Sequence, residues 1–302
     1  MFSAIHKPVL LKEVLKSLDP GHNENFVDCT VGEGGHTEEV LQKNGPDGKV
    51  LGIDLDPLQI SSAEWLKSQF QDRIILVNDS YTNLQEIIER KGFGPVNGIL
   101  LDLGMSSAQL EGRPKGYPEG FSFKVDQGLD MRYNDHFDYL TAEKIVNEWP
   151  EQEIEKILRN YGEEKFSKKI AKNIVEQRKL GRIKTTFQLI EIIKDSTPSA
   201  YWRERIHYAT RTFQALRIAV NDELENIKKV LPQALSVLAP DGRLVIISFH
   251  SLEDRIVKRF FNQLTKKGKA KLLTKKPITA SRDEQKNNPR SRSAKLRAIT
   301  KT

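Results

Sequence analysis

The amino-acid sequence predicts an α/β protein built on a doubly wound parallel sheet, into which a helical subdomain is inserted. Three observations support this prediction. Short apolar segments alternate with amphipathic ones in roughly the first hundred residues. Helical periodicity alone follows, and a strand-like segment returns later in the chain. Strands that alternate with helices are typical of a parallel sheet whose two faces are both covered.

Four buried strands are predicted in the first part of the chain. They cover Phe26 to Thr30, Val50 to Asp54, Ile74 to Val77 and Gly98 to Leu103. Helices are predicted near Thr37 to Lys43, from Asp56-Pro57 to about Phe70, and from about Asn83 to Arg90. The ligand crevice of such a sheet lies beyond the carboxyl ends of its strands, where the strand order reverses.

The alternation stops after the fourth strand. Residues 106–138 are rich in Gly and Pro and predict a loop. Four helices with apolar residues three or four apart follow, at Ala142 to Trp149, Glu151 to Tyr161, Glu164 to Lys179 and Phe187 to Lys194. A helix around Asp222 to Leu238, a turn at 239–242 and a fifth strand at Arg243 to Phe249 come later. We therefore expect a sheet domain of residues 1–111 and 206–302 and a helical insertion of residues 112–205.

The positive charge is concentrated near one end of the chain. The 302 residues contain 48 Lys and Arg and 41 Asp and Glu, a net charge of +7. Residues 263–302 contain thirteen Lys or Arg and two acids, so they carry +11 and leave −4 on the first 262 residues. Strand-like pieces at 272–273 and 296–299 bracket a polar loop, and we interpret them as a basic hairpin edge that contacts phosphates. A solvated tail is the alternative.

Composition also excludes several classes of protein. No apolar run approaches the roughly 18 residues of a membrane span, and the N-terminus lacks the apolar region of a secretory signal. Cys29 is the single cysteine, which excludes a disulfide framework and a multi-cysteine zinc site and fits a reducing cytosol. The sequence therefore predicts a cytoplasmic protein without a membrane span or a metal.

A Gly-rich turn follows the first strand, in the segment Asp28-Cys-Thr-Val-Gly32-Glu-Gly34-Gly35-His36. Glycines let the backbone approach a ligand closely, and the helix that follows favours negative charge at its N-terminus. A dinucleotide fingerprint would need a third glycine where Thr37 stands. An acid four residues ahead of Gly-x-Gly suits S-adenosylmethionine better, because that ligand offers an ammonium to the acid. A simple turn is the alternative.

The second strand ends at Asp54, whose carboxylate could accept hydrogen bonds from both hydroxyls of a ribose. Alone, Asp54 could equally be a helix cap. Because the carboxyl ends of neighbouring parallel strands meet at one edge of the sheet, we interpret Asp54 and the Gly-rich turn together as a cofactor site. The candidate cofactor residues in these two segments are Asp28, Gly32, Gly34, Gly35, His36 and Asp54.

The fourth strand runs into Asp102, beside the expected cofactor, where a methyl acceptor would lie. Methylation of a cytosine ring carbon needs a cysteine nucleophile, but Cys29 lies within the Gly-rich turn. Methylation of an exocyclic amine needs only a group that positions the amine and accepts its hydrogen, as Asp102 could. His250, at the end of the fifth strand, is a second catalytic candidate. The alternatives are that Asp102 only caps a turn and that His250 has a structural role.

Nine motifs occur along the chain in the order found in one enzyme family. They are His6-Lys-Pro-Val-Leu-Leu11, the turn Asp28 to His36, Gly52 to Pro57, Leu101 to Gln109, Gly120-Phe-Ser-Phe123, Leu129-Asp-Met-Arg132, Thr210 to Asn221, Ser248 to Arg255 and Asn288 to Arg297. Nearly end to end, the chain closely resembles the bacterial 16S rRNA cytosine-N4 methyltransferase family (RsmH/MraW). The loop between Gln109 and Gly120 is longer than is usual there, and Tyr208 stands where a proline is usual.

The resemblance implies a Rossmann-like class I methyltransferase sheet that binds S-adenosyl-L-methionine. It implies direct transfer of a methyl group to the N4 amine of a decoding-region cytosine in 16S rRNA of the small ribosomal subunit. It extends the cofactor contacts to Asp102, to Gln109 and to Tyr81, an aromatic residue that follows the third strand. The candidate RNA-binding residues are Arg211, Lys275, Lys276, Arg290 and Arg292.

Two other functions stay open on the sequence alone. The chain could be a DNA or small-molecule N-methyltransferase, or a non-catalytic ribosome-assembly factor that keeps a cofactor pocket. Phe121 and Phe123 could stack on an unpaired base or pack in the core of the insertion. The sequence leaves the oligomeric state open, a homodimer included, and it does not distinguish naked RNA from the assembled subunit as substrate.

Overall fold

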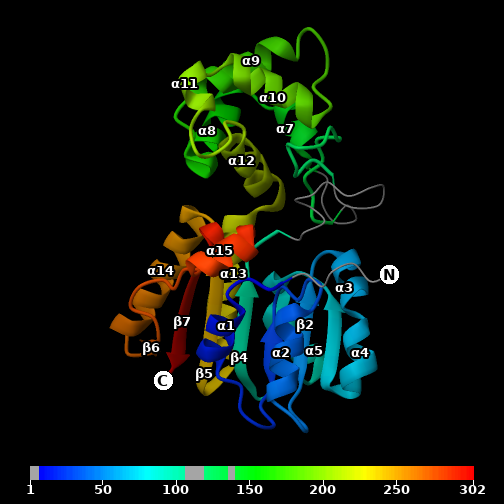
Figure 1. Cartoon of the computed structure of the whole chain (residues 1–302), viewed down its shortest axis with the longest axis vertical. Coiled ribbons are helices and arrows are strands. Elements are labelled where there is room, and N and C mark those ends of the chain that lie inside the picture. Colours follow the sequence, from blue (N-terminus) through cyan, green and yellow to red (C-terminus); the bar gives the residue numbers. More distant parts are fainter. Residues whose placement is uncertain (1–6, 106–118, 135–139) are drawn as a thin grey trace. The chain divides into compact units, whose positions relative to one another are not determined.

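The computed structural model of the chain describes residues 7–105, 119–134 and 140–302. The chain divides into two compact units, one of residues 1–104 and 224–302 and one of residues 105–223 (Figure 1). Among the described residues, no helix is both long enough and apolar enough to cross a membrane.

A seven-stranded sheet with the order β3-β2-β1-β4-β5-β7-β6 forms the centre of the first unit (Figure 1). The strands are β1 (Phe26–Asp28), β2 (Val50–Asp54), β3 (Ile74–Asn78), β4 (Val96–Asp102), β5 (Leu238–Ser248), β6 (Ala270–Leu272) and β7 (Lys295–Lys301). Strands β1 to β5 pair in parallel, whereas β7 pairs antiparallel with both β5 and β6. The strand order reverses between β1 and β4, so the ligand crevice is expected there. This topology confirms the predicted doubly wound α/β fold.

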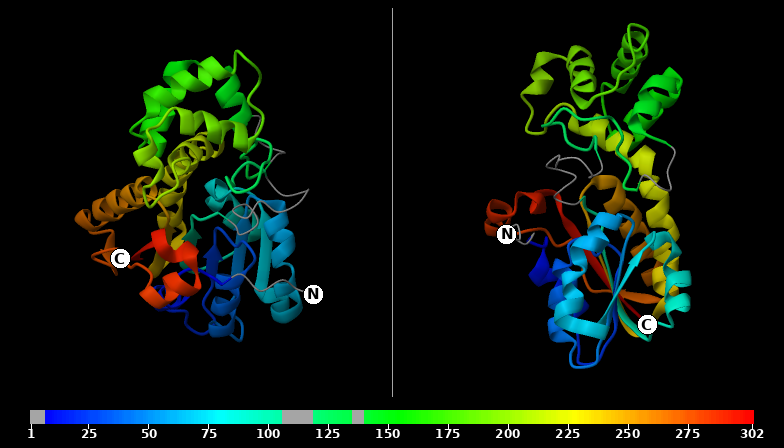
Figure 2. Two further views of the ribbon diagram at one scale, coloured as in Figure 1. Left: turned by 45° about the horizontal axis from the view of Figure 1, so that its top comes forward. Right: turned by 90° about the vertical axis from the view of Figure 1, so that its right-hand side faces the viewer.

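Helices cover both faces of the sheet (Figure 2). They are α1 (Leu11–Leu18), α2 (Gly35–Lys43), α3 (Pro57–Ala63), α4 (Trp65–Phe70), α5 (Leu84–Lys91), α13 (Glu223–Val237), α14 (Ser251–Lys266) and α15 (Arg282–Asn287), with the 3₁₀ helices η1 (Gln71–Arg73), η2 (Tyr81–Asn83) and η3 (Pro289–Ser293). On one face, α5, α13 and α14 pack with Ile99 and Ile246; on the other, α1 to α4 pack with Leu100 and Val245. Successive strand residues point to opposite faces, so continuous apolar runs suit a sheet covered on both sides.

Most of the predicted elements are present, and the differences between their predicted and observed bounds have local causes. Strand β2 has the predicted bounds, whereas β1 already ends at Asp28, where the Gly-rich turn begins. The single helix expected up to Phe70 is divided into α3 and α4. The turn expected at 239–242 is a bulge within β5, because Leu238 pairs with Val96 while Arg243 pairs with Gly98.

The two strands predicted in the C-terminal segment are present as β6 and β7, which pair antiparallel at one edge of the sheet, as the predicted hairpin requires. Contact of this edge with phosphates stays a prediction, and only β6 is the outermost strand. Strand β7 lies between β5 and β6, and Leu296 in it is completely buried. The guanidinium of Arg297 donates to Asp254 Oδ1 at 2.6 Å and to Oδ2 at 3.1 Å, which allows this cation to lie inside the fold. Helices α15 and η3 occupy the predicted loop between the two strands.

The second unit is helical and has a core of its own. Its helices are α7 (Ala142–Glu148), α8 (Glu151–Gly162), α9 (Ser167–Gln177), α10 (Thr186–Asp195), α11 (Ser199–Trp202) and α12 (Thr210–Asn221). The sequence placed 206–223 in the sheet domain, but Phe213 and Leu216 of α12 are buried in the same cluster as Ile154 and Ile170. This shared core extends the unit to residues 105–223, beyond the expected insertion of 112–205.

Candidate functional site

The Gly-rich turn leads from β1 into α2 through two residues with left-handed backbone. Gly32 has a φ of 53° and Gly34, which precedes α2, has a φ of 91°. A Cβ atom at Gly34 would lie 2.7 Å from Cδ1 of Leu66 in α4. Both the positive φ and this close approach therefore require glycine at position 34. Gly35 is the first residue of α2, so the backbone N–H groups at the start of that helix face the end of the sheet.

Asp28 holds the turn from inside. Its side chain is only 4% exposed; Oδ1 accepts a hydrogen bond from Thr30 N at 3.1 Å, and Oδ2 accepts one from Thr37 Oγ1 at 2.8 Å. Burial raises the pKa of Asp28 to about 6, although these hydrogen bonds act in the opposite direction. The Asp28 carboxylate thus joins the turn to the start of α2 through Thr30 and Thr37, two residues that the sequence motifs did not indicate as site residues.

Asp54 joins the end of β2 to the same turn. Its Oδ2 accepts a hydrogen bond from Gly32 N at 2.9 Å, and its Oδ1 accepts one from Asp56 N at 3.0 Å. Asp56 in turn caps α3 by accepting from Leu58 N at 2.9 Å. Burial raises the pKa of Asp54 to about 7 against the lowering effect of its two backbone hydrogen bonds. The predicted neighbours, Asp54 and the Gly-rich turn, are therefore in direct contact.

Asp102, at the end of β4, lies beside His36. Its backbone N–H donates to Thr30 Oγ1 at 2.7 Å, which ties β4 to the turn after β1. Oδ2 of Asp102 is 3.9 Å from Nδ1 of His36, while Oδ1 is buried and has no hydrogen-bond partner among the described residues. Burial, followed by the negative charge of Asp28, raises the pKa of Asp102 to about 7. A buried acceptor of this kind fits an N–H donor of a ligand.

His36 is held from the other side of its ring. Its Nε2 lies 3.0 Å from the carbonyl oxygen of Val9, and because a carbonyl only accepts, Nε2 carries the hydrogen in this contact. Tyr81 begins η2 after β3 and packs, partly buried, against the cluster that contains Ile99. Gln109, the remaining cofactor candidate, lies outside the described residues.

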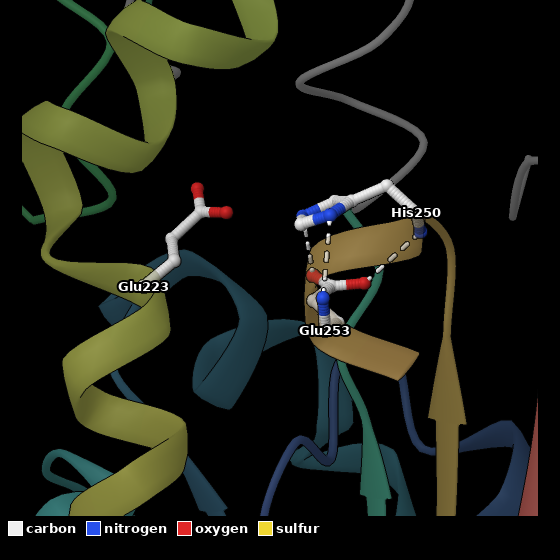
Figure 3. A group of neighbouring side chains, drawn as sticks. All are labelled: Glu223, His250 and Glu253. Carbon is white, nitrogen blue, oxygen red and sulfur yellow. Dashed lines mark hydrogen bonds and ion pairs between the residues drawn. The ribbon is translucent and has the colours of Figure 1, made fainter. Parts of the chain in front are cut away.

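His250 caps helix α14 together with Glu253 (Figure 3). Nδ1 of His250 accepts from Glu253 N at 3.5 Å, and the Glu253 carboxylate accepts from Phe249 N at 2.8 Å and from His250 N at 3.2 Å. Nε2 of His250 lies 3.1 Å from Glu253 Oε1. These contacts favour the structural alternative for His250, and the capping spacing in His-Ser-Leu-Glu is visible in the sequence. Figure 3 also draws Glu223, which pairs with Arg217 at 2.7 Å in the second unit.

The candidate RNA-binding cations differ in their surroundings. Lys275, Lys276 and Arg292 are exposed and make no ion pair with any described residue, whereas Arg290 in η3 is half-buried. Arg211, in the second unit, donates to the Tyr201 hydroxyl at 2.7 Å and lies 3.7 Å from Glu204. The exposed cations are therefore available to a polyanion, while Arg211 is held by its own unit.

Comparison with known proteins gives matches along nearly the whole chain. Residues 3–302 match the family described as the MraW methylase family. The chain is 45% identical over 312 residues to the "Ribosomal RNA small subunit methyltransferase H" of Heliobacterium modesticaldum, covering 98% of each. It is 44% identical over 311 residues to the protein of the same name from Clostridium botulinum, again covering 98% of each. A solved rRNA methylase from Streptococcus thermophilus gives a TM-score of 0.44 at 10% identity over 99% of each chain.

Substitution of Gly34 tests the geometry of the turn. We expect Gly34→Ala to lower the free energy of unfolding by about 2 kcal/mol, because the Cβ atom meets Leu66 and the backbone is left-handed. Urea denaturation measures the change. Gly181→Ala is the matched control, since a Cβ atom there has no neighbour within 4 Å. Equal unfolding midpoints for the two variants would contradict the assigned geometry.

The raised pKa of Asp102 predicts a pH-dependent stability difference. The folded state holds the Asp102 proton up to about pH 7, whereas the unfolded state releases it near 3.8, so the wild-type protein loses stability as the pH rises through this window. Asp102→Asn removes the titration, and we expect it to be more stable than the wild type by roughly 2 kcal/mol at pH 8 and by almost nothing at pH 4. Chemical denaturation across this range measures the difference. Asp72→Asn, at an exposed acid, is the control, and a pH dependence of the Asp102→Asn difference no larger than that of Asp72→Asn would refute the prediction.

Proposed function

The chain belongs to the MraW methylase family and is a methyltransferase that takes its methyl group from S-adenosyl-L-methionine, and we propose that it transfers this group to the N4 amine of a cytosine in 16S rRNA. One observation carries the proposal in the structure. The ends of β1, β2 and β4 present Asp28, Asp54 and Asp102 around one Gly-rich turn. This turn lies next to the reversal of strand order, where doubly wound sheets bind their ligands.

The residues around the turn fit this cofactor. S-adenosyl-L-methionine supplies a methyl group on a positively charged sulfur and also carries an ammonium, a carboxylate and a ribose. Buried carboxylates favour the two positive groups, and the N–H groups of Gly35 and His36 at the start of α2 suit the carboxylate. Asp54 would accept from the ribose hydroxyls, since each carboxylate oxygen has capacity beyond its one backbone hydrogen bond. Tyr81 and Gln109 complete the proposed set by resemblance to the family.

Asp102 is the proposed catalytic residue. The amine nitrogen of the acceptor forms the new bond to the methyl carbon while the bond between that carbon and sulfur breaks, and the nitrogen then loses a proton. The unpartnered Oδ1 of Asp102 would accept an amine hydrogen, orient the nitrogen lone pair and favour this proton loss. A nearby positive charge favours the ionised carboxylate, which offsets its raised pKa. No covalent enzyme intermediate is needed.

We propose a structural role for His250 in place of the catalytic role that was expected from the sequence. Its Nδ1 accepts from the start of α14, and its Nε2 lies beside Glu253. We therefore assign it to holding the junction of β5 and α14, next to the Asp102 strand in the sheet. A loss of methyl-transfer rate in His250→Asn without a loss of stability would instead indicate a direct catalytic role.

The acceptor assignment rests on the relatives and on the exposed cations. The relatives are named ribosomal RNA small subunit methyltransferases, and Lys275, Lys276 and Arg292 are exposed. The helical unit of residues 105–223 would recognise the substrate, and a ribosomal partner would place the enzyme in the cytoplasm. Transfer of labelled methyl groups into small subunits, naked rRNA, DNA and small molecules tests the assignment. Methylation of DNA or small molecules alone would overturn it, and cofactor binding without any transfer would indicate an assembly factor.

Asp102→Ala tests the catalytic assignment. We expect the rate of methyl transfer into small ribosomal subunits to fall at least 100-fold, because the amine loses its acceptor and its orientation. Circular dichroism should show an unchanged fold. Asp19→Ala, which removes an exposed acid near the opposite ends of the strands, is the control and should keep the wild-type rate. Wild-type transfer by Asp102→Ala would exclude the assigned role.

The exposed lysines of the C-terminal segment test the RNA interaction. Lys275→Gln together with Lys276→Gln should weaken binding to rRNA and make the plot of log affinity against log salt shallower by roughly 0.7 to 0.9 for each phosphate that is no longer neutralised. Cofactor affinity should stay unchanged. Lys12→Gln with Lys16→Gln removes the same charge from exposed positions on α1. An identical salt slope for both double variants would show that the segment is only a solvated surface.

A further inference from the structure

Two side chains from the C-terminal part of the first unit hold the N-terminal segment Lys7–Leu10. Oε1 of Glu284 accepts a hydrogen bond from Leu10 N at 2.7 Å, and Nδ2 of Asn288 donates to the Lys7 carbonyl at 3.0 Å. Figure 2 shows α15, which contains Glu284, beside the segment that enters α1. The partners are 274 and 281 residues apart in the sequence, so these contacts exist only in the folded protein.

Leu10 needs such support because of its conformation. It precedes α1 with a φ of 54° and a ψ of 33°, in the left-handed region, and its side chain is completely buried. This conformation costs a leucine about 1 kcal/mol and persists only where the surroundings fix it. The Glu284 carboxylate supplies a charge-assisted hydrogen bond to this residue's own N–H. Glu284 therefore fixes the backbone at the entry to α1.

The backbone fixed in this way reaches the cofactor site through one more residue. The carbonyl of Val9, next to Leu10, accepts from Nε2 of His36, and both side chains are buried. The opposite ring nitrogen of His36 faces Asp102 at 3.9 Å. A continuous series of contacts thus runs from Glu284 through Leu10 and Val9 to His36 and Asp102.

We propose that Glu284 and Asn288 are positioning residues of the cofactor site, which fix the Val9 carbonyl and thereby orient the His36 ring beside Asp102. The proposal rests on the proposed function in so far as His36 and Asp102 are assigned to S-adenosylmethionine. Of the two acids in the basic segment of residues 263–302, the proposal assigns this role to Glu284 and not to Asp283. Asp283 is exposed and makes no hydrogen bond or ion pair with a described residue through its side chain, whereas Glu284 contacts the backbone N–H of Leu10.

Binding of S-adenosylhomocysteine to the full chain in the absence of RNA tests the proposal. Glu284→Ala should weaken this binding five- to tenfold by calorimetry, in line with loss of one charge-assisted hydrogen bond. It should also shift the nitrogen resonances of the His36 ring in the ligand-free protein. Asp283→Ala removes the same charge one residue earlier and should change neither quantity. Glu284→Gln keeps an acceptor oxygen and should restore most of the affinity.

A second pair of variants gives the same test without touching Glu284. Asn288→Ala should weaken binding and shift the His36 resonances, whereas Asn287→Ala, at an exposed neighbour, should not. This pair decides the question if Glu284→Ala does not fold. The proposal is overturned if Glu284→Ala and Asp283→Ala bind alike, or if Glu284→Gln behaves like Glu284→Ala. Lack of binding by the wild-type protein would instead overturn the proposed function, and the His36 spectra would still test the series of contacts.

Discussion

The hydrogen bond from the Gly32 N–H to the Asp54 carboxylate is the contact on which the rest of the site depends. It joins the turn after β1 to the end of the neighbouring strand β2. Thr30 ties the same turn to β4, and Gly34 fixes its far end against α4. Because three strands and a helix hold one short turn, the backbone N–H groups at the start of α2 are placed before any ligand arrives. Such preorganisation reduces the cost of binding.

The electrostatics of the site follow from this close grouping. Burial raises the pKa of Asp28 to about 6 and those of Asp54 and Asp102 to about 7, and the charge of Asp28 adds to the shift of the other two. A cluster of this kind is unfavourable when it is empty and fully ionised, and it becomes favourable when a cation enters. S-adenosylmethionine carries two positive groups, so its binding would return the carboxylates to the ionised form that methyl transfer needs.

Local patterns were sufficient to predict the central fold and the residues of the turn. The glycines and acids at the strand ends have short-range causes, namely a positive φ, a close approach and a shared sheet edge. The pairing of β7 with β5 could not be predicted, because Lys295 and Arg297 suggest an exposed edge strand and the contact with Asp254 that neutralises Arg297 is tertiary. Likewise, helical periodicity in α12 shows that one face is buried but does not show in which of two cores.

The insertion between β4 and β5 has a consequence for how the chain folds. These two strands pair in parallel at the centre of the sheet, although the whole helical unit separates them along the chain. Closing so long a loop is entropically costly and slow unless the intervening residues are already compact. The helical unit has its own core, formed entirely within residues 105–223, so it can collapse first and bring β5 towards β4. We expect the helical unit to acquire hydrogen-exchange protection before the central strands, so the pairing of β4 with β5 forms after the inserted unit has folded.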